Sequence, residues 1–390
     1  MSTTQDPTAQ RRVIIMCDGL GPDYFKRGVM PTLSRWAERG IYRDVEAVMP
    51  SVTNTNNASI CCGAFPAQHG VIGNSYLDTD SGREEYLESS ELLSTATLFD
   101  RAARLGVRSA LLTSKSKTTA LLGSGAEIKL AAEAPEPEWV ARLGQPPAIY
   151  SREINYWLLQ AAETVLRERP DIGCVYVHTT DYAMHTWPPE HADSDEHLRG
   201  MDEQLAALET TAPDAAFLVA ADHGMNAKRR CWDLNKACER RGVPLRMAIS
   251  AERDQHLRHH RGLGGTAWVY LKDRADQEDV RRVLEGLAGV ERVLAREEAV
   301  ASFGLMAQRI GDLVVLGDRE TVFGHLDSDC EELPATYRSY GSTHERAVPL
   351  IIYNAPDAPA PAFFRYNADL ARWLYRANTS SQEQAAVGGC

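Results

Sequence analysis

Three acidic residues of this chain stand where they could act together on a ligand. Asp18, Asp181 and Asp222 each come directly after, or within four residues of, a compact apolar run that is typical of a buried parallel strand. In sheets of this kind ligands bind beyond the carboxyl ends of the strands. We therefore expect the three carboxylates to lie at one edge of a sheet.

Histidines accompany two of these acids. His185 lies four residues after Asp181 in DYAMH, which puts both on one face of a helical turn, and His223 directly follows Asp222 in ADHG. Either motif alone is more often an acid that caps a helix beside a surface histidine. Together with His344 they form the ligand set of a two-metal site, with zinc favoured and manganese or iron(II) also suited to the donors.

A polar segment supplies groups that such metals could activate. Thr53 and Thr55 are hydroxyl candidates in PSVTNTNN, and the following NNASICCGAF resembles a helix opening whose N–H groups favour an anion. A hydroxyl that merely caps the helix is the plainer alternative. Asn74, in HGVIGN, is a neutral amide donor that could hold an oxyanion.

The elements that must position these residues alternate between strands and helices. Apolar runs in 13–17, 172–181 and 215–224 alternate with helical patterns over 154–169 and 197–211. This pattern predicts an α/β fold with a doubly wound, mostly parallel sheet, helices on both faces and an inserted smaller α+β cap. The predicted boundaries are a discontinuous core at 11–240 and 311–378, a cap at 241–310 that 131–150 could join, and a disordered tail at 379–390.

The composition excludes several classes of partner. The chain has 390 residues and a formal net charge of -12, so its overall field does not attract nucleic acid or anionic lipid. Its 8 cysteines form no CxxC pair, and no apolar run reaches membrane-spanning length. We expect a cytoplasmic protein with a small anionic substrate, no nucleic acid, no membrane and a homodimer as one option.

The motifs DG, PSVTNTNN, HGVIGNSY, TTDYAMH and ADHGMNAK follow one another in an order that resembles the alkaline phosphatase superfamily. Within it the chain is most similar to phosphonoacetate hydrolases, over residues 13–354, with the nucleotide pyrophosphatase/phosphodiesterases as the next relatives. The resemblance implies the superfamily's sheet and cap, and Thr53 rather than Thr55 as nucleophile. It implies two zinc ions, one held by Asp18, Thr53, Asp222 and His223, the other by Asp181 and His185, with Asn74 at the oxyanion.

One position departs from the family pattern. A histidine is expected in an Arg-Ser-His-Gly-Gly run before the last strand, where this chain has Tyr340. We expect His344, four residues further on, to supply the third ligand of the second ion, with His325 as a weaker substitute. The alternative is that His344 is only a surface residue and that the second ion is weakly held.

Two lysines in TSKSKTTALLG also match the family, and the resemblance implies that they hold a substrate carboxylate. Lys115 and Lys117 can both reach one ligand only if the chain turns there, since alternate residues of an extended segment point to opposite faces. Two solvated surface lysines are the plainer alternative.

The resemblance thus implies metal-dependent hydrolysis of the carbon–phosphorus bond of phosphonoacetate to acetate and phosphate, through a phosphothreonine. The alternatives are a phosphodiesterase or phosphomonoesterase of the same superfamily, or a hydrolase of another carboxylated phosphonate. A metal-storage protein without turnover is a further class, which a hydroxyl among the ligands argues against.

Overall fold

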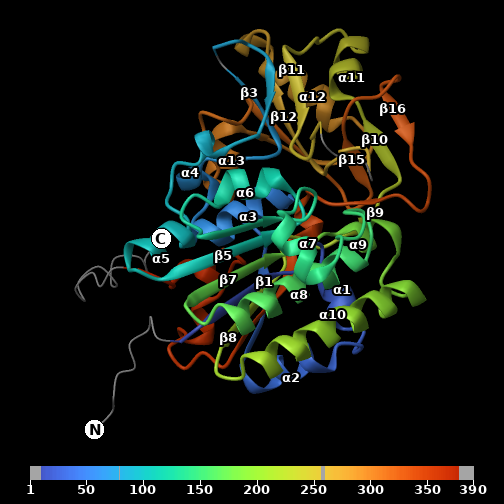
Figure 1. Cartoon of the computed structure of the whole chain (residues 1–390). Helices are drawn as coiled ribbons and strands as arrows, with labels where there is room; N and C mark the ends of the chain where they lie inside the picture. Colours follow the sequence, from blue (N-terminus) through green and yellow to red (C-terminus); the bar gives the residue numbers. More distant parts are fainter. Residues whose placement is uncertain (1–9, 79, 256–259, 377–390) are drawn as a thin grey trace.

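The computed structural model describes residues 10–78, 80–255 and 260–376. A seven-stranded sheet crosses the molecule in the order β2-β18-β8-β1-β7-β5-β6 (Figure 1). β18 is antiparallel to both neighbours, and the other pairs are parallel. The prediction of a mostly parallel sheet is confirmed. The strands are β1 (Arg12–Met16), β2 (Ile41–Glu46), β5 (Arg108–Thr113), β6 (Ile128–Ala131), β7 (Ile172–His178), β8 (Ala216–Ala220) and β18 (Ala347–Tyr353).

β1 lies between β7 and β8, and all its residues are buried. A strand covered on both faces has a continuous apolar run, as here, rather than an alternating one. Met16 pairs with His178 on one side and with Ala220 on the other. The three strands therefore end level with one another, and the segments that follow them start at the same edge.

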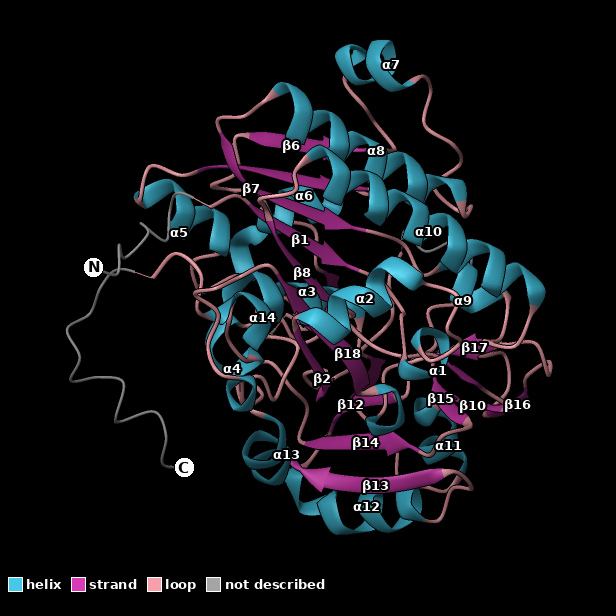
Figure 2. Ribbon diagram, turned by 90° about the horizontal axis from the view of Figure 1, so that it is seen from below, coloured by secondary structure: helices cyan, strands magenta, loops and turns pink. Residues whose placement is uncertain are grey.

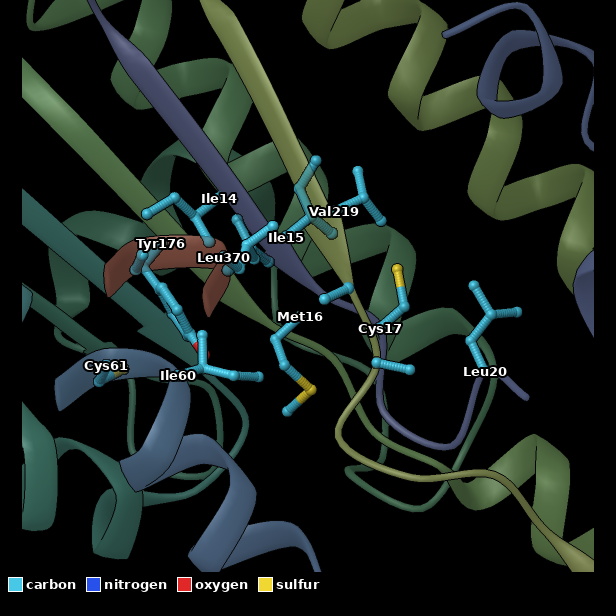
Figure 3. Close-up of a cluster of buried hydrophobic side chains, with 14 of the residues drawn as sticks. Ile14, Ile15, Met16, Cys17, Leu20, Ile60, Cys61, Tyr176, Val219 and Leu370 are labelled. Carbon is cyan, nitrogen blue, oxygen red and sulfur yellow. The ribbon is translucent and has the colours of Figure 1, made fainter. Parts of the chain in front are cut away.

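Helices cover both faces of this sheet (Figures 1 and 2). On one face Trp36 of α2 stacks on Phe217 of β8, with ring centroids 4.6 Å apart. On the other, side chains of β1 meet Ile60 of α3 and Leu370 of α14 in a common core (Figure 3). The first face carries α2 (Pro31–Arg39), α8 (Glu153–Glu168) and α10 (Ala192–Thr211); the second carries α3 (Thr53–Cys62), α5 (Leu98–Arg104) and α14 (Asp369–Arg372).

A smaller antiparallel sheet, in the order β11-β12-β14-β13, builds a second layer with its own core (Figure 2). β14 begins at Leu313, after the predicted end of the cap at residue 310. Its elements are α11 (Leu234–Arg240), β11 (Met247–Ser250), β12 (Thr266–Tyr270), α12 (Gln277–Glu285), β13 (Val290–Ala295), α13 (Arg296–Phe303) and β14 (Leu313–Gly317).

The remaining elements are short. A three-stranded sheet has the order β15-β10-β16, and two pairs join β3 to β4 and β9 to β17. These are β3 (Ser75–Leu77), β4 (Glu84–Tyr86), β9 (Asn226–Ala227), β10 (Arg230–Trp232), β15 (Thr321–Phe323), β16 (Cys330–Glu332), β17 (Arg338–Ser339), α1 (Pro22–Phe25), α4 (Pro66–His69), α6 (Ser116–Leu122), α7 (Pro137–Leu143) and α9 (Tyr182–Thr186). Single 3₁₀ turns are η1 (Ser90–Leu92), η2 (Arg274–Asp276), η3 (Thr343–Glu345) and η4 (Pro361–Phe363).

Two predicted segments need comment. Within 131–150, α7 packs against α8 of the core, at the opposite end of the molecule from β13 and β14 (Figure 2). The predicted tail 379–390 lies outside the described residues. No helix within the described ranges has the length and apolar character to cross a membrane.

Candidate active site

The ends of β1, β7 and β8 bring the three predicted acids to one edge of the sheet, where all three are buried. The ligand atoms of Asp18, Asp222 and His223 lie within 4.8 Å of one another. In the part of the chain that the structure describes, this is the one group of three such side chains with that spacing. The cluster is therefore compact enough to surround a single ion.

Each of the two carboxylates in this cluster contacts protein nitrogen atoms through one of its oxygens. Asp222 Oδ1 accepts hydrogen bonds from the backbone amides of Gly19 at 3.0 Å and His223 at 2.9 Å. Asp18 Oδ2 lies 3.2 Å from Nε2 of His178. The other oxygens, Asp18 Oδ1 and Asp222 Oδ2, are buried and accept no hydrogen bond from any described residue. Buried oxygens of this kind need a partner, and a cation would be one.

Negative charge is crowded at this edge. Burial raises the pKa of Asp18 well above its usual range, and the neighbouring Asp222 and Asp181 raise it further. A divalent cation would offset this repulsion, so the donor set fits a metal ion.

Two of the three predicted ligand histidines are held in the tautomer that a metal requires. Nδ1 of His223 lies 2.9 Å from the carbonyl of Gly224, and Nδ1 of His185 lies 2.8 Å from the carbonyl of Arg338. A carbonyl only accepts, so Nδ1 carries the proton and Nε2 keeps its lone pair. Nε2 of His185 lies 2.9 Å from Asp181 Oδ2. The short helix α9 thus puts this pair on one face, as the spacing predicts.

Thr53 is the first residue of α3, and its hydroxyl points at the cluster. Its Oγ1 lies 3.1 Å from Nε2 of His223. No side chain caps this helix, so the N–H groups of its first turn are available to an anion. Thr53 lines the cavity, whereas Thr55 is fully buried within α3. The geometry favours Thr53 of the two hydroxyls.

Asn74 also lines the cavity, and its amide is fixed by its neighbours. Its Oδ1 accepts from Nδ2 of Asn54 at 2.7 Å, and its own Nδ2 donates to the backbone carbonyl of Glu252 at 3.1 Å. The amide group therefore ties the cap to the first turn of α3.

Lys115 and Lys117 both line the same cavity. Lys115 precedes α6 as its N-cap residue, and this turn brings the two lysines to one side. Nζ of Lys117 lies 2.7 Å from Oδ2 of Asp254, with side chains 10% and 6% exposed. Lys117 therefore already has a buried carboxylate partner.

The sequence model of the type I phosphodiesterase/nucleotide pyrophosphatase family matches residues 12–342. The chain belongs to this family, within the alkaline phosphatase superfamily. The members of this superfamily are metal-dependent enzymes, and the predicted resemblance is confirmed.

Solved structures of relatives share the fold. Phosphonoacetate hydrolase from Sinorhizobium meliloti 1021, in complex with phosphonoformate, has a TM-score of 0.84 and 30% identity over 94% of this chain and 95% of that one. In its complex with phosphonoacetate the TM-score is 0.83. Murine ectonucleotide pyrophosphatase/phosphodiesterase 5, in an inactive variant with AMP, has a TM-score of 0.66 at 15% identity over 93% of this chain and 92% of that one.

Curated relatives match in part. An ectonucleotide pyrophosphatase/phosphodiesterase of Caenorhabditis elegans is 28% identical over 225 residues, which are 55% of this chain and 26% of that protein. An uncharacterized pyrophosphatase/phosphodiesterase of Schizosaccharomyces pombe is 31% identical over 107 residues, 25% of this chain and 22% of that protein. The matched part spans about a quarter of the length of these relatives.

Tyr340 stands where the family pattern has a histidine, and it lies inside the site. Its ring stacks on His223 with centroids 3.5 Å apart, and its hydroxyl is 3.4 Å from Oγ1 of Thr53. The same hydroxyl donates to Oε1 of Glu252 at 2.7 Å. Burial raises the pKa of Tyr340 well above its usual range, and Glu252 raises it further. The phenol therefore stays protonated as a donor.

Sequence reasoning missed three acid or imidazole side chains that line this cavity: Glu252, Asp254 and His260. They lie on the segment between β11 and β12, within the predicted cap, where the sequence pattern indicated secondary structure but no functional residue. Acids grouped just after a short apolar strand, in SAERD, were the available signal. His178, in β7, was likewise missed, because it reads as one residue of a buried strand.

The structure does not bring His344 to the metal cluster. Its Nε2 lies 2.6 Å from Oε2 of Glu291, and the two side chains are 33% and 40% exposed. Ser342 caps the turn η3 with its hydroxyl, which donates to Oε2 of the buried Glu345 at 2.7 Å. Because this turn directs Glu345 inward, the adjacent His344 points outward and meets β13 instead.

His325, the other substitute, contacts Nη1 of Arg253 through its Nε2. Burial lowers the pKa of His325, and the charge of Arg253 lowers it further. The residue does not line the cavity described above.

Proposed function

We propose that this chain hydrolyses the carbon–phosphorus bond of phosphonoacetate to acetate and phosphate, with Thr53 as nucleophile. The observation that carries the proposal is the convergence of Thr53, Lys115 and Lys117 on one cavity beside the metal cluster. This arrangement suits a substrate with a phosphonate at one end and a carboxylate at the other. The likeness to a phosphonoacetate hydrolase at 30% identity over 95% of that chain supports it.

Two divalent ions, with zinc favoured, would occupy the site. Asp18, Asp222, His223 and Thr53 would hold the first, and Asp181 and His185 the second. Bound ions would lower the pKa of the threonine hydroxyl and neutralise charge on the phosphonate oxygens.

Thr53 provides the attacking oxygen, and its position at the start of α3 assists the attack. The hydroxyl proton of Thr53 passes to solvent as the Oγ–P bond forms. The P–C bond breaks in the same step, and its electron pair passes to the methylene carbon. The first-turn amides of α3 and the second N–H of Asn74 donate to the phosphonate oxygens. Water then hydrolyses the phosphothreonine, and a proton taken from solvent completes acetate.

The leaving carbon is a poor carbanion unless its charge spreads into the adjacent carboxylate. Lys115 lines the cavity, and no described residue forms a salt bridge with it. Its ammonium would both bind the carboxylate and stabilise the charge that develops there. Lys117 would also bind the carboxylate once its ion pair with Asp254 is broken.

A panel of three substrates tests this function. Phosphate release from phosphonoacetate and 4-nitrophenol release from 4-nitrophenyl phosphate and bis-4-nitrophenyl phosphate are measured in one metal-loaded preparation. Phosphonoacetate should have the highest kcat/KM. A higher value for either aryl ester would contradict the proposal.

The second candidate is an ester hydrolase of the same family. The Lys117–Asp254 ion pair favours it, because it reduces the positive charge offered to a substrate carboxylate. The family description and the curated relatives, named as pyrophosphatase/phosphodiesterases, point the same way. The panel above separates the two candidates directly.

A further inference from the structure

Glu252 is a buried acid in the reaction cavity that the proposed chemistry does not use. Its side chain is 1% exposed, and its Oε1 accepts from the Tyr340 hydroxyl at 2.7 Å. Oε2 is buried and accepts no hydrogen bond from any residue that the structure describes. A carboxylate oxygen left in this way in a polar cavity indicates a missing ligand.

The backbone around Glu252 is rigidly held. Nδ2 of Asn74 donates to its carbonyl at 3.1 Å, and the amide of Asn74 donates to the carbonyl of Ala251 at 2.9 Å. A Cβ atom on Gly264 would come within 2.7 Å of the Glu252 Cβ, so this glycine is required for the close approach. The acid is therefore placed by the fold.

Glu252 lies beside the pair that would hold the second ion. Its Oε1 is 3.8 Å from Nε2 of His260, whose ring stacks on His185 with centroids 4.2 Å apart. The Tyr340 ring is 5.5 Å from that of His185. The residues around Glu252 thus contact the Asp181–His185 pair directly.

His260 is the competing candidate, and its tautomer argues against it. The amide of Gly262 donates to Nδ1 of His260 at 3.1 Å, so the proton of a neutral ring is on Nε2. His185 and His223 have the opposite arrangement, with Nδ1 facing a carbonyl. His260 therefore presents an N–H donor to the cavity, and Glu252 presents an open oxygen.

We propose that Glu252 supplies, through Oε2, the third protein ligand of the second metal ion, beside Asp181 and His185. This inference rests on the two-ion site of the proposed function. Tyr340 then does not bind the metal as the family histidine would. It orients the carboxylate of Glu252, which is the ligand. Since these three groups do not yet meet the 4.8 Å spacing of the first cluster, ion binding must draw Glu252 toward the pair.

The donor set has a chemical consequence. Two carboxylates and one imidazole are harder ligands than one carboxylate and two imidazoles. The second position should therefore retain manganese better, relative to zinc, than a site with two histidines.

Metal content tests the proposal without reference to turnover. Purified protein is loaded with zinc or manganese and dialysed, and bound ions per chain are counted by mass spectrometry. Wild type should hold two ions, Glu252→Gln should hold one, and the His344→Ala control should hold two. Tyr340→Phe should keep both sites but weaken the second by about 10- to 100-fold, the usual effect of removing a group that orients a ligand.

A rescue variant keeps the test decisive if Glu252→Gln folds poorly. Adding Tyr340→His to Glu252→Gln returns an imidazole at the family position and should restore the second ion. Two tightly held ions in Glu252→Gln would overturn the assignment of Glu252. The assignment would also fail if His260→Ala lost one ion while Glu252→Gln kept both. A single ion in wild type would instead overturn the two-ion site of the proposed function.

Discussion

Four histidines near the site differ in what their Nδ1 atom meets, and the proposed roles follow this difference. His185 and His223 face carbonyls and offer lone pairs. His178 and His260 face N–H donors, the first from Asn57 at 2.8 Å, and offer protons. The printed sequence shows the same residue type in all four cases, so only the surroundings separate ligands from donors.

The two threonines give the sharpest test at this scale. Thr53→Ala should fold and bind metal but lose at least about three decades of kcat, because the attacking oxygen is gone. Thr55→Val, which keeps the shape of a fully buried side chain, should retain kcat within a few fold. The reverse order of effects, in the same assay, would move the nucleophile to Thr55.

Asp254 sets the charge that Lys117 offers to a substrate. Asp254→Asn should lower KM for phosphonoacetate by about tenfold, since a charge-assisted contact is worth about 1.5–3 kcal/mol and the lysine no longer has a competing anion. Hydrolysis of 4-nitrophenyl phosphate, which has no carboxylate, serves as the control. An unchanged KM for phosphonoacetate would show that Lys117 does not bind the carboxylate.

At the scale of elements, the agreement between sequence and structure follows the depth of burial. The predicted helix 154–169 is α8 (Glu153–Glu168), whose apolar face packs on the sheet. The second predicted helix starts at 197, whereas α10 starts at Ala192. Its first turn is polar and has no apolar period; His191 caps it and Asp193 complements the helix dipole.

The wrong prediction for His344 also has its cause at the scale of elements. A single turn, η3, determines which residue of the segment faces inward, and a hydrogen bond between Ser342 and Glu345 fixes that turn. The inward residue, Glu345, meets Nζ of Lys228 at 2.8 Å with both side chains fully buried. The spacing of residues in the sequence does not show whether the inward position holds a partner for a buried ion pair or a metal ligand.

The Lys228–Glu345 pair should make a large contribution to stability when only one partner is removed. Lys228→Met leaves a buried carboxylate without its cation and should lower the free energy of unfolding by about 3–5 kcal/mol. Arg229→Ala, which breaks an exposed pair with Glu320, should cost no more than about 1 kcal/mol. Urea denaturation of both variants makes the comparison, and equal effects would contradict it.

At the scale of the whole molecule, two buried histidines outside the site predict acid sensitivity. Burial lowers the pKa of His69 to about 3 and that of His197 to about 3. Both stay neutral in the fold but take up protons near pH 6.5 when unfolded. Their contribution is complete above pH 6.5 and is lost as pH falls toward 3.

The expected slope follows from proton linkage. Each histidine should lower the free energy of unfolding by about 1.4 kcal/mol per pH unit over the interval from about 6 to 4, beyond what the carboxylates add. Urea denaturation across this range measures the slope. His69→Gln should reduce the slope by the contribution of one histidine, about 1.4 kcal/mol per pH unit. An unchanged slope in that variant would contradict the prediction.

The whole molecule also shows what could be foreseen. The sheet and its acid-bearing strand ends were predictable, because strands buried on both faces leave a continuous apolar signal in β1, β7 and β8. Glu252 and Asp254 were not, since they reach the site only through packing of the smaller sheet on the core. The grouped acids of SAERD are a local signal of a polar segment, but no local pattern shows which distant segment they contact.

The ion pair between Lys117 and Asp254 gives the carboxylate end of the cavity the character of an ion exchanger. In the proposed reaction an incoming carboxylate would displace Asp254 from Lys117, and the aspartate would return as acetate departs. Lys117 would then have an anionic partner at the start and at the end of every turnover, with no charge left bare in a buried position. Acetate should consequently be a weak product inhibitor, because the enzyme contains its own competitor for the place that acetate vacates.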